Sequence, residues 1–244
     1  MSFWNSAIGA MIGFSLGGPI GALLGGVIGS RFGSKRRQKS FSSNQKNQAA
    51  FFAALFACLA KLAKADGQVS KEEVEIVDRF IKERFRFDAE QRTFAIDIFN
   101  HAKDDSNSYE EYASQLSSLL GANKNALVVF YELLFELAMS DGLLHKNEED
   151  LLRKTTSIFG IDQGLFNQLK NQFSTSSSNP YTILGVTKDM PFEEIKIIYL
   201  RKRKEFHPDT LISKGLPEEL LERAKERFIE IQEAYEAIKK TNLQ

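Results

Sequence analysis

The chain has 244 residues with 32 acidic and 32 basic side chains, so its bulk charge favours neither nucleic acid nor an acidic partner. This length allows one large domain or two small ones with appendages. Cys58 is the only cysteine, which excludes an intrachain disulfide and a cysteine-clustered zinc site and suits a reducing compartment. Because its neighbours are apolar, we expect Cys58 to be a small buried hydrophobe rather than a nucleophile.

Residues 1–33 form an apolar, glycine-rich segment without a charged side chain before Arg31. The stretch from Ser6 to Gly29 has about 24 residues, which is long enough to span a bilayer as one helix. A second interpretation is a helical hairpin, because Gly17-Gly18-Pro19 can break the helix into two short ones. Both interpretations predict a membrane segment.

Within this segment a glycine recurs at every fourth position. Small residues at this spacing form a slanting groove on a helix, which favours close helix crossing and a homodimer. The glycines expected to mediate this self-association are Gly13, Gly17, Gly21, Gly25 and Gly29.

A basic linker, residues 34–47, follows. Six basic residues and no acidic one lie between Arg31 and Lys46. This cluster predicts that the rest of the chain stays on the cytoplasmic side of a bacterial inner membrane. A cleaved secretory signal is not expected, because the basic residues follow the apolar run instead of preceding it.

Residues 48–173 show repeated helical periodicity, and no part of the chain alternates with a period of two, so the fold class is all-α. The first predicted helix is apolar on most sides and is expected at the centre of a bundle. Lys61 and Lys64 interrupt it too early for a membrane span. Seven helices are expected, at 48–65, 70–86, 88–102, 108–120, 123–140, 145–159 and 162–173.

An internal repeat lies within this region. "LAKADGQVSKEE" aligns with "LAMSDGLLHKNEE", and each copy joins a long apolar helix, an Asp-Gly turn and a helix that opens with acids. In one interpretation the two aspartates only satisfy backbone N–H groups at the turns. In the other, four carboxylates converge on a divalent cation, without the spacing of an EF-hand. The candidate ligands are Asp66, Glu73, Asp141 and Glu148.

The turn "ADG-x-[VI]-x-x-x-E" resembles the hallmark of the TerB-like helical domain, of the tellurite-resistance type. The resemblance implies a metal-binding or signal-receiving module. No cofactor other than this possible cation is expected.

After a short linker, 174–179, residues 180–244 form a charged helical segment. A helix capped by Asp189 is predicted to start near Met190 and to stop near Phe206, because Pro208 cannot continue it. A second long helix, opening at Pro217, is expected to pack antiparallel to the first. The first helix has an apolar stripe (Ile195, Ile198, Tyr199 and Phe206) and an opposite basic side (Lys196, Arg201, Arg203 and Lys204) that includes Ile197 and Leu200.

This segment resembles a J-domain in "YTILGV", the basic helix, "HPD" and "EIQEAYEAI". The resemblance implies binding to a DnaK-type heat-shock ATPase chaperone and stimulation of its ATP hydrolysis. Leu200 departs from the pattern, since many relatives have a basic residue directly after the helix tyrosine. The chaperone-binding residues implied are His207, Pro208, Asp209, Lys196, Tyr199, Arg201, Arg203 and Lys204. Without the HPD turn, the basic residues would be an ordinary solvated helix face.

The order of membrane segment, TerB-like domain and terminal J-domain resembles the DjlA type of membrane-anchored co-chaperone. An enzyme is not expected, because the three histidines lack partner motifs and the chain has no P-loop, HExxH or nucleophile elbow. The alternative is a metal or stress sensor, or a scaffold, with the J-domain as its output. Expected partners are the chaperone, the bilayer and a second copy of the chain, but no nucleic acid.

Overall fold

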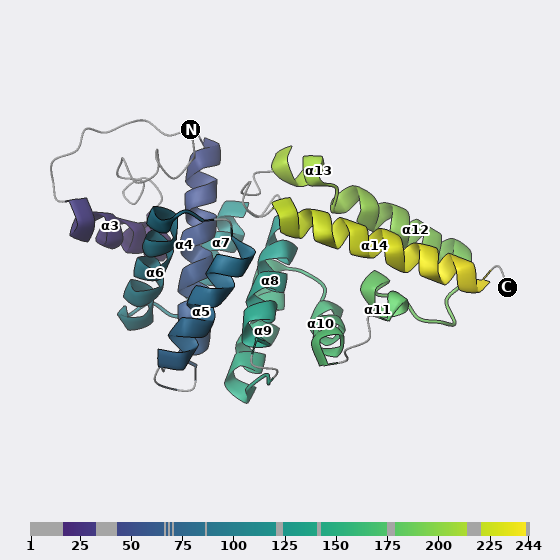
Figure 1. The fold of residues 1–244 in the computed structure, drawn as a ribbon, viewed down its shortest axis with the longest axis horizontal. Coiled ribbons are helices and arrows are strands. Elements are labelled where there is room, and N and C mark those ends of the chain that lie inside the picture. Colours follow the sequence, from purple (N-terminus) through teal and green to yellow (C-terminus); the bar gives the residue numbers. More distant parts are fainter. Residues whose placement is uncertain are drawn as a thin grey trace.

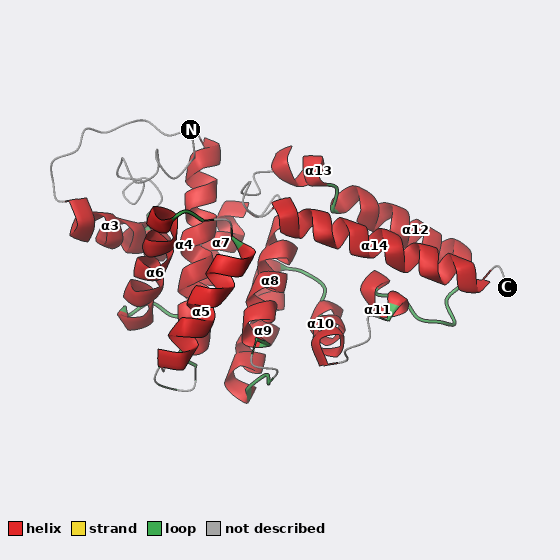
Figure 2. Ribbon diagram, in the orientation of Figure 1, coloured by secondary structure: helices red, strands yellow, loops and turns green. Residues whose placement is uncertain are grey.

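Every regular element in the described part of the chain is a helix, and no strand occurs there (Figure 2). The computed structural model describes residues 17–32, 43–65, 67, 69, 71–85, 87–120, 124–140, 143–174, 179–213 and 221–242. The prediction of an all-α protein is confirmed.

The central bundle, residues 43–174, contains the seven predicted helices within the described residues (Figure 1). Their order and approximate bounds agree with the periodicity of the sequence. The first begins at Ser43, inside the segment expected to be a linker. The helices are α4 (Ser43–Ala63), α5 (Lys71–Arg84), α6 (Ala89–Asp104), α7 (Tyr109–Leu120), α8 (Lys124–Ala138), α9 (Lys146–Phe159) and α10 (Gly164–Ser174).

Helices α4 and α8 form the core of this bundle. Every residue from Ala49 to Ala60 is buried, as expected for a helix that is apolar all round. The rings of Phe51 on α4 and Phe130 on α8 meet edge to face with centroids 5.2 Å apart. Cys58 is fully buried, as predicted, and burial raises the pKa of its thiol, so it stays protonated.

The first helix of each copy of the internal repeat ends with the same hydrogen bond. At the end of α4 the N–H of Ala65 donates to the carbonyl of Leu62 at 3.0 Å, and at the end of α8 the N–H of Ser140 donates to the carbonyl of Leu137 at 2.9 Å. These four residues are equivalent in the sequence alignment of the two copies. In both copies a second helix follows the turn, α5 after α4 and α9 after α8.

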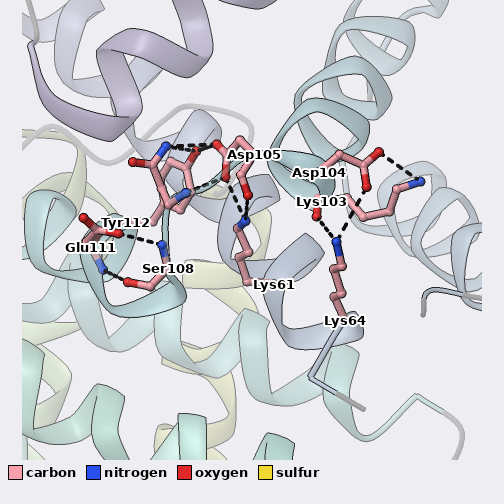
Figure 3. Close-up of polar contacts among 9 residues, drawn as sticks. Lys61, Lys64, Lys103, Asp104, Asp105, Ser108, Glu111 and Tyr112 are labelled. Atoms are coloured by element: carbon pink, nitrogen blue, oxygen red, sulfur yellow. Dashed lines mark hydrogen bonds and ion pairs between the residues drawn. The ribbon is translucent and has the colours of Figure 1, made fainter. Parts of the chain in front are cut away.

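The corner between α6 and α7 is tied to α4 by Asp105 (Figure 3). Lys61, one of the two lysines at the end of the apolar helix, forms an ion pair with Asp105 at 2.8 Å. Burial favours a raised pKa for Asp105, but hydrogen bonds from Lys61, Tyr112 and Asn107 outweigh it and hold the pKa below its usual range. Lys64 donates to the carbonyl of Lys103 at 2.8 Å. Both lysines thus anchor this corner.

Helix α3 (Gly18–Phe32) packs against α4, α6 and α7. Four of its large apolar residues, Ile20, Leu23, Leu24 and Val27, are buried. Gln115 on α7 clamps its first turn: the side-chain carbonyl accepts from the N–H of Ile20 at 2.8 Å, and the side-chain amide donates to the carbonyl of Gly17 at 2.7 Å. The central bundle therefore binds this helix in a specific position.

The prediction of one continuous helix from Ser6 to Gly29 is wrong, because α3 begins at Gly18. Gly17 and Gly18 both have φ of +59°, a conformation that favours glycine, and Pro19 follows in the first turn. This is where the hairpin interpretation placed the break. Residues 1–16 lie outside the described residues.

The C-terminal domain contains α11 (Pro180–Leu184), α12 (Phe192–Glu205), α13 (Pro208–Ser213) and α14 (Leu221–Asn242). Helices α12 and α14 pack antiparallel, as predicted, with the stacked rings of Tyr199 and Tyr235 centred 3.9 Å apart. The predicted cap is wrong: α12 begins at Phe192, and Asp189 does not cap it because Pro191 holds the N-cap position. Pro217 lies outside the described residues.

A buried ion pair joins the C-terminal domain to the central bundle, where α14 begins beside α8 (Figure 1). Glu132 on α8 and Arg227 on α14 are only 1% and 2% exposed, and Arg227 Nε lies 3.1 Å from Glu132 Oε1. Arg223 Nη2 lies 4.0 Å from the other oxygen of Glu132. Asn125 on α8 also donates to the carbonyl of Glu205 at 3.1 Å.

Lys202 lies at the edge of this junction. A Cβ at Gly185 would lie 3.4 Å from Lys202 Nζ and 3.1 Å from the side-chain oxygen of Gln168, so Gly185 is restricted by space as well as by its φ of +65°. Burial lowers the pKa of Lys202 to about 8, and the positive charge of Arg227 acts in the same direction. Nearby carboxylates offset these effects only in part.

We predict that Gln115→Ala loosens α3 on the bundle. Loss of both hydrogen bonds costs about 1 kcal/mol of local stability, so the α3 amides should exchange with solvent about fivefold faster. Hydrogen exchange measured by mass spectrometry checks this. Ser114→Ala, a change at an exposed residue of the same helix, is the control. Equal exchange rates of the α3 amides in the two variants would contradict a stabilising role of Gln115.

We predict that Glu132→Ala destabilises the chain, because it removes one of the two carboxylates that pair with the buried charge of Arg227 and leaves it only Glu230 at 3.0 Å. The expected loss in the free energy of unfolding is about 2–3 kcal/mol, below that of a buried charge left with no partner, and is measured in urea. The control is Glu226→Ala, whose half-exposed carboxylate pairs with Arg223 at 3.4 Å and should cost at most about 1 kcal/mol. Equal losses in the two variants would show that the buried pair has no special role.

We predict that Lys202→Met stabilises the chain at neutral pH. The ammonium loses its proton near pH 8 in the folded state and near 10.5 in the unfolded state. The cost of burying its charge is therefore complete below pH 8 and disappears as the pH rises toward 10.5. The variant should gain about 1–3 kcal/mol in urea unfolding at pH 7 and much less at pH 10, whereas exposed Lys204→Met should stay within about 0.5 kcal/mol. A gain in the free energy of unfolding that increases from pH 7 to pH 10 would contradict this prediction.

Candidate functional site: an exposed HPD turn beside a basic helix

His207, Pro208 and Asp209 form the connection between α12 and α13. Helix α12 ends at Glu205, with Phe206 as its C-cap. Helix α13, which the sequence did not predict, begins at Pro208, a favourable first-turn position for proline. The N–H groups of Thr210 and Leu211 donate to the carbonyl of His207 at 3.0 and 3.2 Å. His207 therefore caps α13, and the turn is fixed by a helix on each side.

The side chains of this turn are held but accessible. The backbone N–H of Asp209 donates to His207 Nδ1 at 3.3 Å, and the imidazole ring packs edge to face on Phe228 with centroids 5.3 Å apart. The side chain of Asp209 is 87% exposed. This carboxylate is consequently free of the bundle and points to solvent, as the sequence predicted for the turn.

The basic side chains predicted on α12 lie on its exposed surface. Glu193 and Glu194 occupy the first turn of the helix, and the basic residues increase in number toward the HPD end. This gives the helix a charge gradient that favours contact with an acidic surface near the turn. The exposed cations are Lys196, Arg201, Arg203 and Lys204.

Tyr199 lies in a different environment from these cations. It is 8% exposed and stacks on Tyr235 inside the C-terminal domain. Its ring therefore fixes α12 on α14, and a direct contact between Tyr199 and a partner stays a prediction.

The interface with the central bundle lies at the same end of α12 and α14 as the HPD turn. Its members on the C-terminal domain are Arg223, Arg227, the carbonyl of Glu205 and the carbonyl of Ile183, which accepts from Gln168 at 3.3 Å. The side chains of His207 and Asp209 nevertheless stay exposed beside it.

Of the four candidate metal ligands, only Glu148 has a described side chain, so a cation site formed by all four stays a prediction. Asp66 and Asp141 lie outside the described residues, as does the side chain of Glu73. Glu148 accepts from the N–H of His145 at 3.0 Å and so helps to cap α9. No group of three side chains suited to hold a metal ion occurs among the residues described.

A small cavity of about 60 Å³ does lie between the two copies of the repeat. It is bounded by the ends of α4 and α8 and by residues of α5 and α9. Polar atoms reach it from Ser140, His145 and Glu148.

Sequence reasoning missed the residues that join the two domains. Glu132 is an acid inside the apolar run "ALVVFYELLFELA", and Lys202 follows Ile195 and Tyr199 along the buried stripe of α12. Each is a charge at a position where helical periodicity predicts an apolar side chain. A charged residue on the buried side of a predicted helix was therefore the sequence feature that could have indicated the junction between the domains.

The predicted membrane glycines are only partly described. Gly17 and Gly25 are exposed, whereas Gly21 is buried, and a Cβ at Gly25 would contact nothing within 4 Å. Gly13 and the surroundings of Gly29 lie outside what the structure describes. Among the described residues, no helix has both the length and the apolar character needed to cross a membrane.

Comparison with family models identifies three regions in the predicted order. Residues 1–39 match the transmembrane domain of the co-chaperone DjlA. Residues 52–171 match the tellurite resistance protein TerB, and residues 179–243 match the DnaJ domain. No solved structure matched the chain.

Curated relatives extend these matches over most of the chain. The co-chaperone protein DjlA of Photobacterium profundum is 34% identical, covering 82% of this chain and 80% of the relative. DjlA of Aliivibrio fischeri is 30% identical over 83% and 82% of the two chains. DjlA of Escherichia coli is 30% identical over 98% of each chain. With its HPD turn and terminal helical hairpin, the chain therefore belongs to the DjlA family of J-domain co-chaperones.

Proposed function

We propose that this co-chaperone binds a DnaK-type heat-shock chaperone and stimulates its ATP hydrolysis, without catalysis of its own. The observation that carries the proposal is the HPD turn, which is fixed between two helices yet exposes its carboxylate. A rigid turn loses little conformational entropy on binding. An exposed Asp209 is suited to accept a charge-assisted hydrogen bond from an arginine of the chaperone.

The basic side chains of α12 have a separate role in this proposal. Exposed cations increase the rate of encounter with an acidic surface, and salt weakens that effect. Because Lys196, Arg201, Arg203 and Lys204 lie on the helix that ends at the turn, they would orient the chaperone toward His207 and Asp209. Tyr199 would act indirectly by fixing this helix.

We further propose attachment to the bacterial inner membrane through the segment 1–33, whose helix α3 packs on the central bundle in this structure, with the central bundle 43–174 and the C-terminal domain 180–244 in the cytoplasm. The match to a DjlA transmembrane domain supports attachment. The basic cluster after Ser30 supports the orientation. Gly17, just before α3, and Gly25 on α3 are exposed and so accessible for self-association, with Gly13 and Gly29 as further candidates, whereas Gly21 is buried.

One observation favours the alternative, in which the central bundle senses a signal and the J-domain responds. Helix α8 ends beside the cavity between the repeats, where Leu137 and Ala138 line it, and the same helix holds Arg227 through Glu132. A single rigid helix therefore connects the turn of the second repeat to the C-terminal domain.

We predict that His207→Gln and Asp209→Asn each reduce stimulation of the chaperone by more than about tenfold, because they remove contacts at the turn. The measurement is single-turnover ATP hydrolysis by the cognate DnaK-type chaperone with the full chain in detergent. Asp189→Asn changes another exposed acid of the same domain and should stimulate like wild type. Stimulation by the HPD variants equal to wild type, or none by wild type, would reject the proposal.

A further inference from the structure

Four large hydrophobic side chains are strongly exposed within the described part of the chain, and two of them share one helix. Ile197 and Leu200 on α12 are 66% and 50% exposed, and the others, Leu143 and Ile229, lie elsewhere. Single exposed hydrophobic residues are common on protein surfaces. A pair three residues apart on a helix forms one continuous apolar surface, and this pair is on the helix that leads to the HPD turn.

Helical geometry places Leu200 near the middle of the exposed face of α12. Ile195 and Tyr199, which are buried, mark the opposite side. At 100° per residue, Lys196, Arg203 and Lys204 all lie within about 60° of Leu200 around the helix. Leu200 precedes His207 by seven residues, or about 10 Å along a helix. The apolar pair is thus surrounded by cations and close to the turn.

We propose that Ile197 and Leu200 form the apolar centre of the face that docks on the DnaK-type chaperone, and that this face requires a chaperone surface with an apolar patch bordered by acids. The inference rests on the proposed function and adds a specificity element to it. Charged rims give orientation and rate, whereas buried apolar centres supply most of the affinity. Leu200, which stands where many relatives have a basic residue, would then contact the chaperone through its apolar side chain.

The charge distribution favours a protein surface over a lipid surface as the occupant. Glu193 and Glu194 lie in the first turn of the same helix, where anionic headgroups would be repelled. The cations instead gather toward the HPD end, next to the residues proposed to act on the chaperone. A protein surface whose acids are confined to the part that faces the HPD end, beside an apolar patch, matches this pattern, whereas a uniformly anionic lipid surface does not.

The test compares Ile197→Ser/Leu200→Ser with Ile229→Ser, a control residue that is also 50% exposed but lies on α14. The full chain in detergent is titrated into the chaperone, and single-turnover ATP hydrolysis is followed. The double variant should raise the concentration for half-maximal stimulation at least about tenfold, and Ile229→Ser should not. Saturating double variant should still stimulate, because the HPD turn is intact.

Salt separates the apolar contribution from the charged one. At 1 M KCl the Debye length falls to about 3 Å, so cation contacts are screened while apolar contacts persist. The wild-type protein should therefore keep a measurable affinity for the ATP-bound chaperone at high salt, and the double variant should not. Equal residual binding by the two proteins would overturn the inference.

Asp209→Asn distinguishes this inference from the function on which it rests. If Asp209→Asn is inactive while the double variant behaves as wild type, the apolar centre is rejected and the proposed function stands. If Asp209→Asn stimulates like wild type, the proposed function fails first. A loss in Ile229→Ser as large as in the double variant would also reject the apolar centre.

A last arm tests for lipid as the occupant. A polarity-sensitive dye is attached at Glu193→Cys, and buried Cys58 should not react. Its emission should change when ATP-bound chaperone is added to the full chain in vesicles of phosphatidylethanolamine and phosphatidylglycerol. A change on reconstitution into these vesicles alone, with none on adding chaperone, would assign the face to the membrane and overturn the inference.

Discussion

The buried contact between Glu132 and Arg227 sets the arrangement of the two domains. Each residue belongs to a helix of a different domain, and neither is more than 2% exposed. A buried carboxylate without a cation is unfavourable by several kcal/mol, so the C-terminal domain supplies the partner that Glu132 requires, whereas Arg227 also pairs with Glu230 on its own helix at 3.0 Å. Arg223 adds a second positive charge near the carboxylate of Glu132. The contact therefore disfavours orientations of the C-terminal domain that leave Glu132 without a cation.

That orientation has a functional consequence for the HPD turn. The bundle contacts the start of α14 and the carbonyl of Glu205 at the end of α12, and His207 and Asp209 beside these contacts remain exposed. A J-domain held in this way presents its turn in a fixed direction relative to α3. The central bundle then holds the J-domain in a fixed orientation, in addition to any sensing role.

Helix α12 combines three surfaces on fourteen residues. Ile195 and Tyr199 pack on α14, Lys202 reaches the junction with the bundle, and Leu200 lies among cations on the outside. A helix keeps these surfaces separate because residues three or four apart share a face. Changes on the outer face should therefore affect partner binding without disturbing the packing of the domain.

Local sequence patterns were sufficient to predict the all-α fold class, the number and order of the central helices, the antiparallel terminal hairpin and the HPD turn. These features follow from local rules: helical periodicity, glycine conformations and the inability of proline to continue a helix. Only the tertiary structure shows that Glu132 pairs with Arg227 and that Gln115 holds the first turn of α3 on the bundle. These contacts join residues about a hundred positions apart, and local patterns carry no information on such pairings. The sequence shows that residue 202 is a lysine, but only the structure shows that its ammonium is buried and that this burial destabilises the folded chain at neutral pH.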